Sequence, residues 1–215
     1  MEKAYKTVFK YGVDEVMINK SRFIGYSMPI ETEEDALEFV EQIKEENKDA
    51  THNVFAYVVG ESSNVQRFND DGEPSGTAGI PALEVIKKED LRNVVVVITR
   101  YFGGIKLGGG GLIRAYTKAA KIALEAGKIA DMIPHIKLAI SIDYTAYGKI
   151  ENYLINSEYI LDETVYDEKV NIYVYVKTED IEDFHKVIMN LTSGECEIEE
   201  ISREYIAMKG NIKLV

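Results

Sequence analysis

The sequence predicts an α+β protein of two domains, residues 1–131 and 135–215. The chain has 215 residues, of which 46% are apolar, so it can bury a sizeable core. The order of strand-like and helix-like segments changes near His135, and the segment that joins the two halves is short and contains Pro134. After that point the order is strand, helix, strand, strand, helix, strand.

In the first half, strands are predicted where β-branched and aromatic residues gather, at 5–12, 14–20, 21–30, 53–60 and 93–99. The last of these is apolar throughout, which is typical of a strand buried on both faces. Apolar residues at helical spacing predict helices at 32–47, 80–91 and 111–128. Thr32 and Asn47 are the expected ends of the first helix, and Gly127 closes the third.

In the second half, strands are predicted at 135–143, 159–166, 167–177 and 196–208, and helices at 146–158 and 178–194. Thr178, which acidic residues follow, is the expected N-cap of the second of these helices. The βαββαβ order predicts a ferredoxin-like domain, in which two helices cover one face of an antiparallel sheet. Neither an internal repeat nor a low-complexity segment is present in the sequence.

The composition narrows the class of protein. The net charge of -12 argues against indiscriminate coating of DNA but leaves room for a local basic surface. The single cysteine, Cys196, cannot form an internal disulfide, which fits a reducing compartment. The sequence shows neither a secretory signal nor an apolar run long enough for a membrane helix. We therefore expect a cytoplasmic protein without a membrane partner, as a monomer or a small homo-oligomer.

The segment YFGGIKLGGGG, residues 101–111, holds six of the 16 glycines. It lacks the third glycine of the dinucleotide fingerprint and the Lys-Ser/Thr of the P-loop, so neither nucleotide motif applies. It lies between a predicted buried strand and a predicted helix, where unpaired backbone N–H groups attract anions. The alternative is a pliable connection that lets the strand and helix pack closely.

The charges around these glycines are one-sided. Residues 92–128 contain seven basic residues and one acidic residue, Glu125, which gives +6 and leaves -18 for the rest of the chain. The expected apolar face of the third helix comprises Leu112, Ile113, Tyr116, Ala119, Ala120, Ala123 and Leu124. A basic stripe on its solvent side comprises Arg114, Lys118, Lys121 and Lys128. A solvated helix face would explain these charges, but the one-sign stripe favours a phosphate backbone or an acidic partner.

A second segment, residues 67–81, consists mainly of turn-forming residues and predicts a structured loop. Its Asp70, Asp71 and Glu73 could hold a hard cation, but solvated turn acids or salt links to Arg67, Arg100 or Lys106 are the other interpretations. Ser75 lacks the G-x-S-x-G context of a nucleophile. His52, ahead of a strand, is expected either to pack or to face a ligand.

Four segments resemble the IMPACT family, in particular its two-domain bacterial members of the YigZ type. They are KSRFIG (20–25), ATHNVFAY (50–57), DDGEPSGTAGIP (70–81) and NVVVVITRYFGGIKLGGGGLIRAY (93–116). The second half resembles the second domain of those bacterial members. The sequence departs from the family at three positions, because the family commonly has threonine, arginine and cysteine where Gly109, Ile80 and Val54 stand.

The resemblance implies a fold and a role. The first domain would resemble a small-subunit ribosomal protein and domain IV of elongation factor G, and the second would resemble domain V of that factor. Eukaryotic relatives regulate translation during amino-acid starvation by competing for an activator of the kinase that phosphorylates initiation factor 2. The resemblance supplies no catalytic residues.

These observations lead to the hypothesis of a non-enzymatic binding protein linked to translation regulation, without cofactor or metal. It would contact RNA, the ribosome or a translation-associated protein through Arg100, Tyr101, Phe102, Gly103, Gly104, Lys106, Gly108, Gly110, Gly111, Arg114, Lys118 and Lys121, with Asp70, Asp71, Glu73, Ser75 and His52 beside them. It requires Arg100, Lys106 and Arg114 to share one exposed surface. The alternative is a hydrolase that acts on a small phosphate- or peptide-containing substrate through the Asp70–Gly76 loop.

Overall fold

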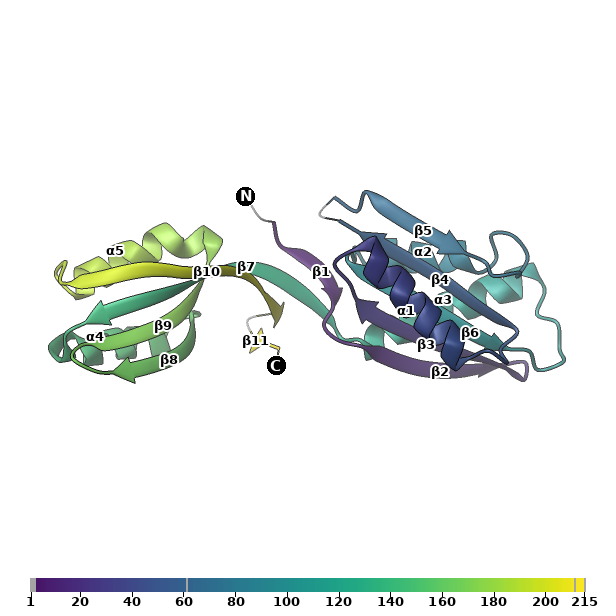
Figure 1. The fold of residues 1–215 in the computed structure, drawn as a ribbon, viewed down its shortest axis with the longest axis horizontal. Coiled ribbons are helices and arrows are strands. Elements are labelled where there is room, and N and C mark those ends of the chain that lie inside the picture. The colour runs from purple at the N-terminus through teal and green to yellow at the C-terminus, as the bar shows by residue number, and fades with distance from the viewer. Residues whose placement is uncertain (1–2, 61, 211, 215) are drawn as a thin grey trace. The chain divides into compact units, whose positions relative to one another are not determined.

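The chain divides at Asp131 into two units, and the computed structural model describes residues 3–60, 62–210 and 212–214 (Figure 1). One unit comprises Tyr5–Asp131. The other comprises the chain from Met132 onward together with the residues before Tyr5. The division falls inside strand β7 (Ile129–Ile142). Both sheets are antiparallel wherever their registers are resolved, so the predicted α+β class is confirmed.

Within the described residues, the first unit is built on a five-stranded sheet of order β2-β3-β6-β4-β5. Its strands are β2 (Gly12–Ile18), β3 (Ser21–Pro29), β4 (His52–Val59), β5 (Val65–Asn69) and β6 (Val94–Tyr101), and β1 (Tyr5–Val8) pairs instead with β7. Its helices are α1 (Glu33–Glu46), α2 (Gly79–Lys88) and α3 (Gly109–Ala126).

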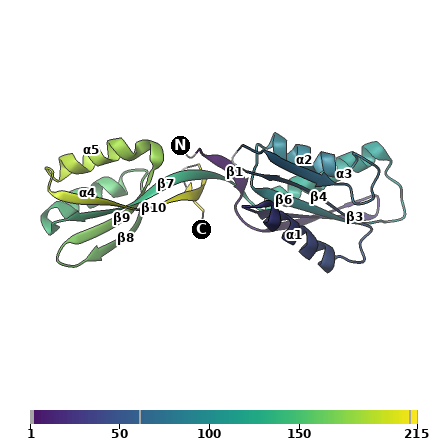
Figure 2. The same ribbon diagram turned by 45° about the horizontal axis from the view of Figure 1, so that its top comes forward.

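Helices cover both faces of this sheet, α1 on one side and α2 with α3 on the other (Figure 2). The central strand β6 shows the division, because Val94, Val96 and Ile98 pack with α2 and α3 whereas Val95 and Val97 pack with α1. Alternate side chains of a strand point to opposite faces, so a strand between two helical layers must be apolar at every position. The prediction that this strand is buried on both faces is confirmed.

The helix ends follow local chemistry. Thr32 and Asp35 form a reciprocal capping box at the start of α1, and Asn47 is its C-cap, as predicted. Helix α3 begins at Gly109, two residues earlier than expected, and Gly127 is its C-cap. The predicted apolar face was wrong at one position, because Ile113 is 43% exposed and Ala115 is buried instead. Leu112, Ala115 and Tyr116 are spaced at i, i+3 and i+4 and form the buried seam of the helix. Ile113 lies outside this seam and is therefore exposed.

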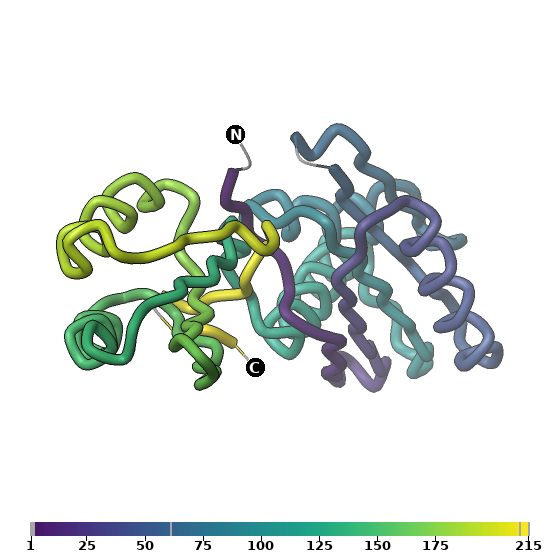
Figure 3. The backbone as a smooth tube through the Cα atoms, turned by 60° about the vertical axis from the view of Figure 1, so that its left-hand side comes forward, coloured from purple at the N-terminus to yellow at the C-terminus, as the bar shows by residue number. Residues whose placement is uncertain are grey.

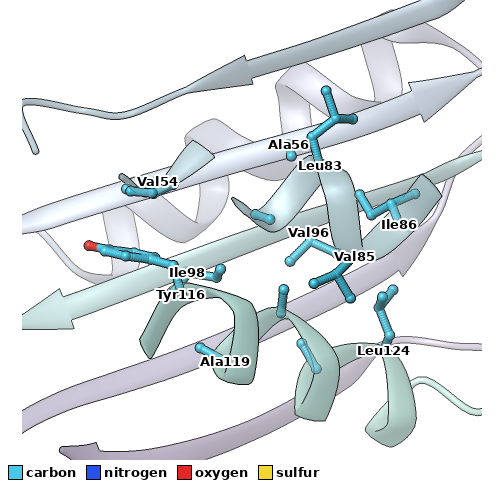
Figure 4. Packing of buried hydrophobic residues seen from close by; sticks show 14 of the residues in the cluster. Val54, Ala56, Leu83, Val85, Ile86, Val96, Ile98, Tyr116, Ala119 and Leu124 are labelled. Atoms are coloured by element: carbon cyan, nitrogen blue, oxygen red, sulfur yellow. The ribbon is translucent and has the colours of Figure 1, made fainter. Parts of the chain in front are cut away.

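Helix α3 lies very close to β3, and small residues make this approach feasible. Figure 4 shows Ala119 and Leu124 of α3 packed against the valine-rich strands of the sheet. A Cβ atom on Gly25 would lie 2.4 Å from the carbonyl oxygen of Ala119. The Ser27 hydroxyl donates a hydrogen bond of 2.7 Å to the carbonyl oxygen of Ala123. The helix backbone is therefore docked onto the strand, which fixes the position of its N-terminus.

The second unit follows the predicted βαββαβ order, which can be traced by colour from green to yellow in Figure 3. After β7 come α4 (Tyr144–Ile155), β8 (Ile160–Tyr166), β9 (Val170–Lys177), α5 (Ile181–Leu191), β10 (Cys196–Lys209) and β11 (Ile212–Lys213). Its sheet order is β11-β10-β7-β9-β8. Residues of both helices, such as Ile150 and Phe184, share one core with β7 and β9, so both helices cover the same face.

Three local features differ from the predictions. Strand β5 extends over Val65–Asn69, where a loop was expected from Arg67, and β11 was not predicted. Thr178 does not cap α5, because its hydroxyl donates to the carbonyl oxygen of Pro134 at 3.2 Å and a short 3-10 turn, Thr178–Asp180, precedes the helix. Short edge strands and 3-10 turns are fixed by tertiary contacts, which the sequence pattern does not display.

Candidate functional site

The loop between β5 and α2 is folded around the carboxylate of Asp70. This carboxylate accepts hydrogen bonds from the backbone N–H groups of Gly76 at 2.8 Å, Ala78 at 3.1 Å and Gly79 at 2.7 Å. The N-cap residue of α2, Ala78, has no side-chain oxygen to offer. Asp70 therefore satisfies the first turn of α2 from outside the helix, with a negative charge at its positive end.

Asp71 fastens the same loop to the start of β4. Its carboxylate accepts a hydrogen bond from the backbone N–H of Asn53 at 2.6 Å, and its carbonyl oxygen lies 2.6 Å from Nδ1 of His52. A carbonyl oxygen can only accept, so Nδ1 of His52 carries the proton in this contact. The other ring nitrogen, Nε2, lies 3.9 Å from Oε1 of Glu73, which is too far for a hydrogen bond.

Glu73 is the centre of a buried polar cluster. Its side chain is 3% exposed, and Oε1 accepts hydrogen bonds from Nη1 of Arg100 at 2.6 Å and from the Tyr116 hydroxyl at 2.7 Å. The Arg100 guanidinium carbon lies 5.4 Å from the ring centres of both Phe23 and Phe102. A buried charge is tolerated only when it is paired and hydrogen-bonded, and here the loop, β6 and α3 each contribute one member of the cluster.

The surroundings of Tyr116 raise the pKa of its phenol far above the ordinary value of 10.0, first because the group is buried and then because it donates to Glu73. The folded state therefore favours the neutral phenol. This preference stabilises the folded protein fully below pH 10, and the stabilisation is lost as the pH rises from there through the raised pKa of the folded state. We expect the Tyr116 ring to remain neutral at about pH 11, where an exposed tyrosine is mostly ionised.

This expectation can be checked by alkaline titration of the protein carrying carbon-13-labelled tyrosine, with the Tyr116 signal assigned from Tyr116→Phe. A midpoint for Tyr116 near the ordinary value would contradict the buried contact with Glu73.

A cavity of about 390 Å³ lies beside this cluster, at the start of α3. It is lined by Thr51, His52, Glu73, Pro74, Arg100, Phe102, Lys106, Leu107, Gly108, Gly109 and Leu112. The N-cap residue of α3 is Gly108, which makes no side-chain capping bond, and the first helical bond runs from the Leu112 N–H to the Gly108 carbonyl. The N–H groups of Gly109, Gly110 and Gly111 thus have no acceptor within the helix. The site combines apolar walls with unsatisfied donors.

The structure brings together only part of the predicted site. Six of the predicted residues line the cavity: His52, Glu73, Arg100, Phe102, Lys106 and Gly108. Asp70 and Asp71 shape the loop instead, and Ser75 is exposed. Tyr101 packs with the core on the α1 face, where its hydroxyl donates to the side chain of Asn47 at 3.0 Å.

The glycines of the predicted site differ in role. A Cβ atom on Gly103 would lie 2.0 Å from the carbonyl carbon and oxygen of Lys20, so this glycine permits a close backbone approach. Gly104 adopts a positive φ of 84° in open space. Gly110 and Gly111 lie in the first turn of α3 and directly follow Gly108 and Gly109, which line the cavity.

The expectation that Arg100, Lys106 and Arg114 share one exposed surface was wrong for Arg100. This residue is 5% exposed and is paired with Glu73, whereas Lys106 and Arg114 are exposed. The cause is strand alternation, because Arg100 follows Val96 and Ile98 on the face of β6 that α2 and α3 cover. Of the salt links considered for the loop, the one with Arg100 is confirmed, and Arg67 instead lies 3.6 Å from Glu33.

Tyr116 was predicted only as part of an apolar helix face, and its hydroxyl was missed. A tyrosine in such a seam indicates a polar partner, because a buried phenol requires a hydrogen bond.

The three acidic side chains of the loop do not converge on one point where a metal ion could bind. The carboxylates of Asp70, Asp71 and Glu73 each accept hydrogen bonds from a different set of donors. The described residues contain no cluster of three histidine, cysteine or acidic side chains suited to a metal ion.

The fold and site define a two-unit α+β protein in which a buried acid–arginine–tyrosine cluster adjoins a glycine-rich helix start. Residues 19–124 match the Impact N-terminal domain, and residues 140–195 match a domain of unknown function, DUF1949. The chain is 45% identical to IMPACT family member YvyE of Bacillus subtilis (strain 168), over 96% of this chain and 95% of the relative. This chain belongs to the IMPACT family.

Other relatives support the assignment. IMPACT family member YigZ of Escherichia coli (strain K12) is 35% identical over 66% of this chain and 74% of its own. Protein IMPACT-B of Xenopus tropicalis is 32% identical over 47% of this chain and 32% of its own. A crystal structure described as that of a hypothetical protein is 28% identical, with a TM-score of 0.60 over 94% of this chain and 99% of its own.

Among the described residues, each helix is too short or too polar to cross a bilayer.

Proposed function

We propose that this chain is a non-enzymatic binding protein linked to translation regulation in the cytoplasm, and that it contacts RNA through the basic face of α3. This face comprises Arg114, Lys118 and Lys121. The observation that carries the proposal is the exposure of all three cations in a chain of net charge -12. Arg114, Lys118 and Lys121 lie three or four residues apart, so they project from one side of the helix.

The cations of this face are largely available to a partner. Arg114 and Lys118 form no ion pair within the described chain, and Lys121 has only a distant, exposed contact of 3.8 Å with Glu125. An exposed pair of this kind contributes little, whereas phosphate contacts release condensed counterions and drive binding. Membership of the IMPACT family, together with the expected resemblance of the two units to domains IV and V of elongation factor G, supports a role beside RNA.

Exchanging Arg114 and Lys118 together for glutamate should weaken the binding of single-stranded RNA and flatten its salt dependence. The slope of log affinity against log salt should fall by about 0.7 for each phosphate that the variant no longer neutralises. Fluorescence anisotropy across a potassium chloride series measures both quantities. The matched control is the exchange of Lys44 and Lys48, because these lysines belong to α1 and its C-terminal flank, on the opposite side of the sheet.

If the wild-type protein does not bind RNA, or if both double variants bind alike, contact with RNA through α3 is refuted. Recovery of the tagged protein from cells, with and without nuclease, then separates the remaining partners. A partner that survives nuclease is a protein, whereas one that disappears with it is RNA or a ribosome.

A hydrolase is the second candidate, and one observation favours it. The loop places Glu73, and the start of β4 places His52, at the wall of a cavity that could hold a small substrate. Ser75 is exposed and makes no hydrogen bond to an imidazole in the described structure, so it does not supply the nucleophile of a triad. A screen of phosphate esters and peptides, with His52→Ala as the control, decides between turnover and binding.

A further inference from the structure

We propose that the cavity at the start of α3 is a binding site for a phosphate monoester of about the size of a mononucleotide. The site is distinct from the basic face of α3 and does not depend on RNA binding there. The cavity of about 390 Å³ falls within the range of small-molecule sites, roughly 300–1,000 Å³. It therefore has room for an organic group beside the phosphate.

The first set of phosphate ligands is the row of backbone N–H groups at the start of α3. This helix has 18 residues, so its aligned peptide dipoles place a partial positive charge at Gly109, Gly110 and Gly111. A Cβ atom on Gly111 would lie 3.0 Å from Cβ of Leu107, but the space at Gly108 and Gly109 is open, since a Cβ atom on Gly108 would meet nothing within 4 Å and one on Gly109 would meet only the Thr77 methyl group at 3.9 Å. An anion can approach the backbone there without a side chain in its path.

The second observation is independent of the helix and concerns Arg100, whose side chain lines the same cavity and is 7% exposed. Its Nη1 donates to Glu73, whereas its buried Nε has no hydrogen-bond partner in the described part of the chain. Buried donors are almost always paired in folded proteins. Because this Nε atom is itself buried, the Arg100 side chain must shift slightly before an acceptor oxygen in the cavity can supply the partner that the protein does not.

The charge balance favours an anion. Glu73 offsets the charge of Arg100, which leaves Lys106 and the positive end of α3 without an opposing carboxylate on the cavity wall. His52 also lines the cavity, and because Nδ1 carries the proton of the neutral ring, its Nε2 would donate to the ligand only when the imidazole is protonated. Donors thus converge from α3, β6 and the segment before α3, and a phosphate monoester has enough oxygens to engage all of them.

The remaining wall fits the organic part of the ligand. Phe102, Leu107 and Leu112 line the cavity with apolar surface. An aromatic ring can stack or pack against such a surface, as nucleobases do on aromatic side chains. Free phosphate would satisfy the donors but leave this wall uncovered, so a mononucleotide should bind more tightly than phosphate alone.

The test uses the full chain, with inorganic phosphate, the four 5′-ribonucleoside monophosphates and the matching nucleosides as probes in calorimetric titrations. We expect saturable binding of at least one monophosphate and binding of its nucleoside that is weaker by about tenfold or more, the usual loss of charge-assisted hydrogen bonds. Chemical shifts of the Gly109, Gly110 and Gly111 amides should move on titration, which places the phosphate at α3. Lys106→Gln should weaken binding several-fold.

A second pair of probes identifies the source of the phosphate. If a 5′-phosphorylated RNA oligonucleotide moves the same amides and its 5′-hydroxyl counterpart does not, an RNA end is a ligand of this site, and otherwise the ligand is a free mononucleotide. The Lys118→Glu, Lys121→Glu double variant should leave mononucleotide binding unchanged, because both lysines lie about two turns or more beyond Gly111 on α3, and this separates the site from the basic face. The absence of saturable binding of every phosphate probe, equal binding of nucleosides, or shifts confined to other residues would overturn the proposal.

Discussion

Replacing Arg100 with methionine should lower the free energy of unfolding of the 5–131 unit by about 3–5 kcal/mol, the usual effect of breaking a buried ion pair. The reason is that the Glu73 carboxylate, 3% exposed, would lose the cation 2.6 Å away and stay buried beside the Tyr116 hydroxyl alone. Urea unfolding of the full chain measures the loss, and hydrogen exchange of the β6 amides assigns it to this unit.

The control for this variant is a double-mutant cycle with Glu73→Gln. Because the double variant contains no uncompensated buried charge, it should be more stable than Arg100→Met alone, and the cycle should show clear coupling between the two residues. A loss below about 1 kcal/mol for Arg100→Met, the value typical of exposed pairs, would show that the pair is not buried as described.

Gly25→Ala should destabilise the same unit by about 1–3 kcal/mol or more, because an added methyl group in a packed core forces the backbone to shift. Its Cβ atom would lie 2.4 Å from the Ala119 carbonyl oxygen and 2.9 Å from Cβ of Ala123. The helix must then move away from β3, which also displaces the start of α3 from the cavity.

Thermal unfolding of Gly25→Ala and Gly110→Ala provides a matched comparison. Gly110 is in the first turn of α3, and a Cβ atom there would meet only the Arg114 guanidinium at 3.9 Å. This second variant should therefore not destabilise the protein, since alanine is the better helix former. Equal losses in both variants would contradict the close contact between α3 and β3.

The sequence predicted those parts of the fold in which local pattern and burial agree. Most of the apolar seam of α3, the N-cap Thr32 and the βαββαβ order of the second unit follow from periodicity and capping residues. β5 was hidden because it runs into a turn-rich loop, and an edge strand of this kind has a mostly exposed pattern. β11 is only two residues long, which is too short for any periodicity to appear.

The site was predictable in its residues but not in its geometry. The glycines, the acidic loop and His52 were identified, yet the apolar run of β6 gave no alternation from which to assign the face of Arg100. Only the helices above and below the sheet determine that this arginine turns inward to Glu73. The cavity likewise arises from β6, the loop and α3 together, and such a juxtaposition depends on the sheet order rather than on any one segment.

The contacts of the acidic loop restrict changes in its length. Asp70 holds the start of α2, and Glu73, three residues later, reaches Arg100 of β6 and Tyr116 of α3. One inserted residue can displace the following chain by up to about 3.5 Å. A shift of that size would break the hydrogen bond of 2.6 Å between Glu73 and Arg100. Insertions and deletions between Asp70 and Glu73 would therefore be removed by selection during evolution, although loops elsewhere are the usual places for chains to change length.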